Sequence, residues 1–107
     1  MDNAIAQYST DELTFATGEV SLVGANVYIS FVQGQKIVLE KTDEDCTITA
    51  EQITLPLSQA DTGALSAGGL EIQIKAVFRD GTAPVSNWMQ TEVIRTAKKG
   101  VLEYVER

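Results

Sequence analysis

The densest group of side chains that could do chemistry is the acidic run Asp43-Glu44-Asp45, with Glu40 close by in the sequence. Carboxylate oxygens are the ligands that Ca²⁺ prefers, and it takes about six to eight of them. The run lacks the alternating acidic residues and the glycine with which a calcium loop wraps its ion. A solvated turn between two strands explains the same residues, and we expect no metal here.

Two further features could act as catalytic groups. Glu71 and Glu92 could face each other as paired carboxylates, but the solvent side of any strand carries such residues. Cys46 would need a nearby base or cation to form a reactive thiolate. Its neighbours Glu44 and Asp45 are acidic, so we expect a small buried hydrophobic residue instead.

The composition of the 107 residues excludes several classes of site. The sequence contains no His and one Cys, so it can form no Ser-His-Asp triad, Cys-His pair, Cys/His zinc site or internal disulfide. The net charge of −7 disfavours binding of nucleic acid through a basic face. No apolar run approaches the roughly 18 residues of a membrane span. We therefore expect no enzymatic activity, no cofactor, no nucleic-acid partner and no membrane partner.

Apolar and polar residues alternate along most of the chain, which is typical of strands with one buried face. The predicted strands cover residues 13–16, 26–33, 36–41, 46–50, 52–57, 70–78 and 88–96. Ser58 begins the segment that departs from this period, and we expect it to cap a single helical turn. About seven short strands separated by turn signals predict an all-β, antiparallel β-sandwich.

The alternation also predicts which residues form the core and how the chain is divided. The apolar residues in phase are Val27, Ile29, Phe31, Ile37, Leu39, Ile53, Leu55, Leu70, Ile72, Ile74, Ala76 and Phe78. Residues 1–11 are expected to be a flexible N-terminal tail. Residues 12–107 are expected to be one sandwich domain with a C-terminal extension over residues 97–107.

Several of these segments, in this order, resemble one family. They are VYISFVQG at 27–34, IVLEK at 37–41, ITLPLSQADT at 53–62, GLEIQIKA at 69–76, then Asp80-Gly81 and Ser86-Asn87. Together they resemble small proteins encoded in the structural regions of tailed phages and prophages of Firmicute-type bacteria. The chain is similar to the immunoglobulin-like domain at the N-terminus of their upper baseplate proteins. Ser58 and Lys75 depart from the family's usual Thr and Arg.

The resemblance implies a single immunoglobulin-like β-sandwich that is a non-enzymatic structural or assembly component of the phage particle, in the tail, baseplate or neck. It also implies a virion location after synthesis in the host cytoplasm. The partners would be other phage structural proteins or further copies of the chain in a homo-oligomer. The alternative that the residues leave open is a carbohydrate-binding or cell-surface-binding sandwich module.

Apolar residues on outward strand faces, beside an edge strand or in the extension are the candidate interface. Trp88 could equally fill the core, since Trp is common both in sandwich cores and at binding hot spots. The expected interface residues are Tyr28, Val32, Trp88, Met89, Val93, Tyr104 and Val105.

Overall fold

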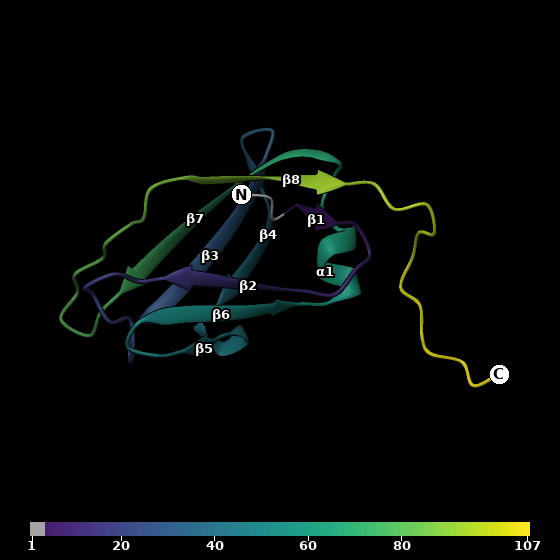
Figure 1. Ribbon diagram of the computed structural model, residues 1–107. Coiled ribbons are helices and arrows are strands. Elements are labelled where there is room, and N and C mark those ends of the chain that lie inside the picture. The colour runs from purple at the N-terminus through teal and green to yellow at the C-terminus, as the bar shows by residue number, and fades with distance from the viewer. Residues whose placement is uncertain (1–3) are drawn as a thin grey trace.

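The structure is a computed structural model that describes residues 4–107, and within these residues eight strands form two facing sheets (Figure 1). The large sheet has the strand order β1-β8-β7-β3-β4, and the small sheet has the order β2-β6-β5. The strands are β1 (Ile5–Ala6), β2 (Asp11–Ala16), β3 (Asn26–Gln33), β4 (Lys36–Thr42), β5 (Thr47–Ile48), β6 (Gln52–Leu57), β7 (Gly68–Val77) and β8 (Met89–Ile94). The two short helices are the 3-10 turn η1 (Asp43–Asp45) and α1 (Gln59–Gly63).

The expected all-β, antiparallel β-sandwich is confirmed, with two short helices where the sequence predicted one helical turn. The bounds of β3 and β6 coincide with the strands read from the alternation, and Ser58 is the N-cap of α1. One strand pair departs from the antiparallel pattern, because β1 runs parallel to β8.

The N-terminal segment differs from the flexible tail expected over residues 1–11, of which residues 1–3 lie outside the described residues. Ile5 is fully buried, and β1 pairs with β8 through Ile5 and Val93. Asp11 already belongs to β2. The expectation was wrong here because a strand of two residues is too short to show a period of two.

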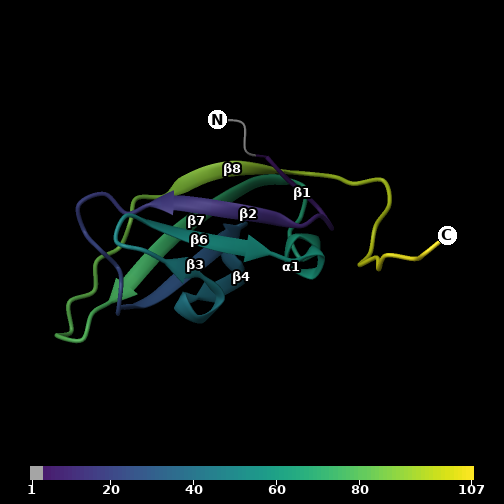
Figure 2. The same cartoon turned by 60° about the horizontal axis from the view of Figure 1, so that its bottom comes forward.

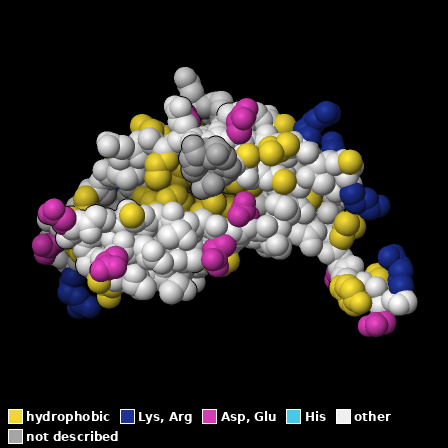
Figure 3. Space-filling model, viewed as in Figure 1, with side chains coloured by type: hydrophobic (Ala, Val, Ile, Leu, Met, Phe, Trp, Pro, Cys, Tyr) yellow, Lys and Arg dark blue, Asp and Glu magenta, His cyan; other side chains and the backbone are white. Residues whose placement is uncertain are grey.

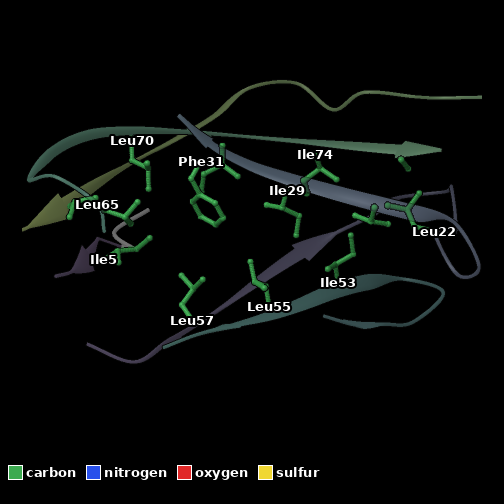
Figure 4. Close-up of a cluster of buried hydrophobic side chains, with 14 of the residues drawn as sticks. Ile5, Leu22, Ile29, Phe31, Ile53, Leu55, Leu57, Leu65, Leu70 and Ile74 are labelled. Carbon is green, nitrogen blue, oxygen red and sulfur yellow. The ribbon is translucent and has the colours of Figure 1, made fainter. Parts of the chain in front are cut away.

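The core lies between the two sheets, and the inward faces of β3, β6 and β7 supply most of it (Figure 4). The predicted residues that are buried are Val27, Ile29, Phe31, Ile53, Leu55, Leu70, Ile72, Ile74 and Ala76. Leu39 and Phe78 are partly buried and pack against this cluster. The core also contains residues that the strand phase did not predict: Ile5, Leu22, Ala25, Leu57, Leu65 and Val93.

One predicted core residue, Ile37, is instead 59% exposed. The register of β3 and β4 shifts by one residue, so that Phe31 lies opposite Leu39 whereas Val32 lies opposite Ile37. The extra residue of this β-bulge is Val38, which packs against the core. One inserted residue exchanges the two faces of a strand, and the alternation therefore gave the wrong face for Ile37.

The bulge predicts unequal effects of two similar truncations. Ile29→Ala should lower the free energy of unfolding by about 3–4 kcal/mol, because it leaves a cavity in a fully buried site. Ile37→Ala should change it by less than about 0.5 kcal/mol, as an exposed substitution does. Urea denaturation of both variants measures the difference, and equal losses would contradict the register shift.

Candidate functional site

The acidic run Asp43-Glu44-Asp45 forms η1, and its hydrogen bonds hold the turn itself. Asp45 Oδ2 accepts a hydrogen bond from the Thr42 N–H (2.9 Å), and Asp43 Oδ1 accepts one from the Val27 N–H (2.9 Å). These carboxylates therefore cap the turn and fasten it to β3. Among residues 4–107, no group of three or more His, Cys, Asp and Glu side chains is placed to hold a metal ion.

Cys46, which follows η1, is a half-buried thiol rather than an activated one. Its Sγ donates to the Thr42 carbonyl at 3.3 Å. Burial raises the pKa of the Cys46 thiol, and the charges of Asp45 and Asp43 raise it further. The thiol is thus protonated at neutral pH and is a poor nucleophile.

The two glutamates considered as a carboxylate pair do not lie directly opposite each other. In the register of β7 and β8, Glu71 lies opposite Gln90, and Glu92 lies opposite Gly69. The strand geometry therefore places the two carboxylates diagonally, without the direct opposition that the paired site would need.

A groove lies between the sheets, where β2 forms one wall and β7 and β8 form the other. It has a volume of about 580 Å³, and Leu13, Phe15, Ile72 and Met89 contribute apolar side chains to its lining. Figure 3 shows hydrophobic side chains gathered in this hollow. We call it the β2 groove.

The β2 groove continues past Phe15 into a second hollow of about 200 Å³. This second hollow follows β2 to Thr17, and its lining includes Leu22, Ile74 and Val85. The two hollows together follow the length of β2, and both have apolar side chains in their lining.

Some main-chain N–H and C=O groups of β2 point toward the groove instead of toward β6. The Thr17 N–H donates to the Glu51 carbonyl at 3.0 Å, so the main-chain groups of Thr17 point toward the chain of β6. In an antiparallel pair, only every second residue points its N–H and C=O toward the partner strand. The main-chain groups of Glu12, Thr14 and Ala16 therefore point away from β6. The Glu12 N–H reaches Asp11 Oδ1 at 2.8 Å, and within residues 4–107 no strand pairs with this edge.

Two of the expected interface residues face inward, and a third is buried on the outer face. Val93 is only 4% exposed and belongs to the core. Val32 is 8% exposed, but it lies opposite Glu71 and Ile37, on the face directed away from the core. Met89 lies opposite Ile72 and shares its inward face, because opposite residues of an antiparallel pair project to the same side. The expected outer apolar face of Met89 and Val93 is therefore wrong, although Met89 does line the β2 groove.

The other expected interface residues are exposed but lie apart. Trp88 is 52% exposed just before β8, and Tyr28 is 39% exposed on β3. Tyr104 and Val105 lie in the C-terminal extension, where Tyr104 is 87% exposed. The sequence reasoning missed the edge of β2, whose only signal was a short alternating run.

After β8, residues 95–107, which include the C-terminal extension, pass α1 and end away from both sheets (Figure 1, Figure 2). The side chain of Gln59 in α1 holds it at one residue: Gln59 Nε2 donates to the Leu102 carbonyl (2.9 Å), and the Leu102 N–H donates to Gln59 Oε1 (2.8 Å). Val101, Leu102, Tyr104 and Val105 are all exposed.

No family model matches the sequence, and no curated protein matches it. Among solved structures, the chain is similar to CopC from Methylosinus trichosporium OB3b, with a TM-score of 0.51 and 14% identity. The match covers 91% of this chain and 89% of that chain. At this identity the likeness shows the fold alone, a β-sandwich.

The structural comparison contradicts the function expected from the sequence. The structural neighbour is CopC and not a component of a phage particle. The role in a phage tail, baseplate or neck is therefore withdrawn, together with its glycan-binding alternative. The resemblance to a baseplate domain, the virion location and the phage partners stay predictions without a test. Among residues 4–107, no helix is long and apolar enough to cross a membrane.

Asp61 stabilises the helix that holds the extension. Asp61 Oδ2 accepts from the Ser58 N–H (2.9 Å), the Asp61 N–H donates to Ser58 Oγ (3.1 Å), and Lys41 Nζ lies 2.9 Å from Asp61 Oδ1. Burial by itself raises the pKa of Asp61, but the hydrogen bonds from Ser58 and Lys41 outweigh it, so that the pKa is lowered.

This geometry predicts a pH-dependent contribution to stability. A carboxyl with a depressed folded pKa stabilises the fold above its unfolded pKa, and the contribution is lost as the pH falls through the folded pKa. Asp61→Asn should lower the free energy of unfolding by about 0.5–1 kcal/mol at pH 7 and by less below about pH 4. Urea denaturation at both pH values measures this.

Asp80→Asn is the matched control for this experiment. The pKa of Asp80 is also lowered, by hydrogen bonds from Thr82, but Asp80 contacts neither α1 nor the extension. If Asp61→Asn loses as much stability in acid as at neutral pH, the carboxylate does not act as described.

Proposed function

We propose that this chain is a non-enzymatic protein-binding domain that receives an extended polypeptide strand in the β2 groove. The observation that carries the proposal is the edge of β2, whose main-chain groups at Thr14 and Ala16 point away from β6, toward the β2 groove and the hollow that follows it. A strand added at such an edge gains main-chain hydrogen bonds, while alternate side chains enter the groove.

The edges of the two sheets differ in how they are protected. Within the described residues, β1 and β5 are edges of two residues each, too short to template a partner. The other long edge, β4, carries Lys36, Lys41 and the bulge at Val38, which are devices that discourage strand pairing. The strand β2 spans six residues without Pro, Gly, Lys or a bulge. Its edge is therefore the one best suited to receive a strand.

The state of the titratable groups supports a binding role without catalysis. The carboxylates of Asp43, Asp45 and Asp61 accept hydrogen bonds from main-chain N–H groups, and the raised pKa of Cys46 keeps that thiol protonated. Copper binding is not carried over from CopC. The described residues offer no group of three suitable side chains, and the sequence has no His.

A substitution at the open edge tests the proposal. Proline is tolerated in an edge strand where its missing N–H faces away from the sheet, and the Thr14 N–H does so. Thr14→Pro should therefore keep the fold but remove one donor and place a ring where the added strand must lie. The matched control is Thr14→Val, which keeps the N–H and the strand propensity.

The probe is a synthetic peptide of about eight alternating Thr and Val residues with a Lys at each end. We expect it to shift the backbone amide resonances of Thr14 and Ala16 in the wild type and in Thr14→Val. In Thr14→Pro, the dissociation constant should rise at least about tenfold, since a lost hydrogen bond and a clash together exceed ~1.4 kcal/mol. Equal binding by all three proteins, or shifts confined to β4, would refute the proposal.

A further inference from the structure

Four large apolar side chains in the C-terminal extension are exposed over about half or more of their surface. Val101, Leu102, Tyr104 and Val105 are 49–87% exposed within a stretch of five residues. A solvated tail of this composition is costly, since buried apolar area is worth about 25 cal/mol per Å². The segment is therefore suited to lie against another surface.

The alternation of the segment matches a strand with one apolar face directed into a groove. Leu102 and Tyr104 would project to one side of a strand, and Glu103 would project to the other with Val101 and Val105. Leu102 and Tyr104 are the largest of the four apolar side chains, and they fit a floor formed by Leu13, Phe15 and Met89.

The two hydrogen bonds between the Gln59 side chain and Leu102 leave the other edge of this segment free to pair with a strand. Gln59 occupies the main-chain N–H and C=O of Leu102, which lie on one edge of an extended chain. The main-chain groups of Val101 and Glu103 lie on the opposite edge, because they alternate in direction. The segment can therefore pair along its free edge while Gln59 still holds it.

Length and charge also match the β2 groove. Residues 101–106 span about 20 Å when extended, as do the six residues of β2. Four of the eight basic residues of the chain lie in residues 95–107, although the whole chain has a net charge of −7. Asp11 and Glu12 place carboxylates at one end of the β2 groove. Residues 101–106 themselves carry Glu103 and Glu106, so it is the flanking basic residues that are complementary to these carboxylates.

We propose that the occupant of the β2 groove is the C-terminal segment 101–106 of a second copy of this chain, added as a strand to the edge of β2. This inference rests on the proposed function and names its partner. The segment ends on the far side of α1 from the groove of its own copy (Figure 1), so a neighbour is the geometric recipient. Each copy then carries one segment that it donates, the donor, and one groove that receives a segment, the acceptor. This arrangement leads to head-to-tail assembly.

Two variants of the full chain separate donor from acceptor. The donor-deficient variant carries Leu102→Ser with Tyr104→Ser, at exposed positions that leave the fold intact. The acceptor-deficient variant is Thr14→Pro. Val101→Ser with Val105→Ser is the matched control, because it replaces two exposed apolar side chains of the same segment on the face directed away from the groove.

Sedimentation equilibrium over a concentration series provides the readout. We expect the wild type to associate, and each deficient variant alone to associate at least about tenfold more weakly. A mixture of the two variants should form a one-to-one complex, because one retains the groove and the other retains the segment. The control variant should associate as strongly as the wild type. Raised salt should weaken the association of the wild type.

A synthetic peptide of residues 97–107 separates failure of this inference from failure of the proposed function. We expect it to shift the Thr14 and Ala16 amides of the donor-deficient variant and to compete with wild-type association. If the Thr/Val peptide binds but the 97–107 peptide does not, or if the wild type is monomeric at every concentration, the second-copy inference is refuted and the groove function stands. If neither peptide binds, both are refuted.

Discussion

The unequal width of the two sheets is the constraint on which the rest of this structure depends. Each sheet has an apolar face that must be buried against the other, yet in the described residues five strands oppose three. Beside the edge of the small sheet, Met89 on the inward face of β8 lines the β2 groove together with Leu13 and Phe15 of β2. Ile5 of β1 is fully buried, and the β2 groove is a part that no strand of residues 4–107 covers.

The five residues of α1 connect parts of the chain that lie far apart in the sequence. Buried Thr62 accepts a hydrogen bond from the Ser9 N–H (2.9 Å) and donates to the Ser9 carbonyl (2.7 Å). Gly63 lies so close to the ring of Tyr8 that a Cβ would clash with it. With Gln59 bound to Leu102, the helix positions both the segment before β2 and the extension after β8. Both the groove and its proposed occupant therefore depend on one capped helical turn.

The likeness to CopC illustrates how far a shared fold can be used. Two chains that are 14% identical have a similar arrangement of strands over most of their length. The arrangement follows from alternating apolar residues and short turns, which many sequences satisfy, whereas binding depends on particular side chains at particular places. The chemistry of this chain must therefore be argued from its own residues, and those residues favour main-chain recognition of a strand.

The sequence by itself determined the features that depend on neighbouring residues. The alternation in β3 and β6 predicted these strands to their ends, and Ser58 predicted the start of α1, since side-chain direction and helix capping are set within a few residues. Only the tertiary structure decided that β1 pairs with β8, that Val38 bulges out of register and that Val93 faces inward. These features depend on which distant strand lies alongside, and the groove at β2 arises from the absence of such a strand in the described part of the chain. A local period records that a strand has two faces, but the pairing of the sheets decides which face is buried and which edge is left open.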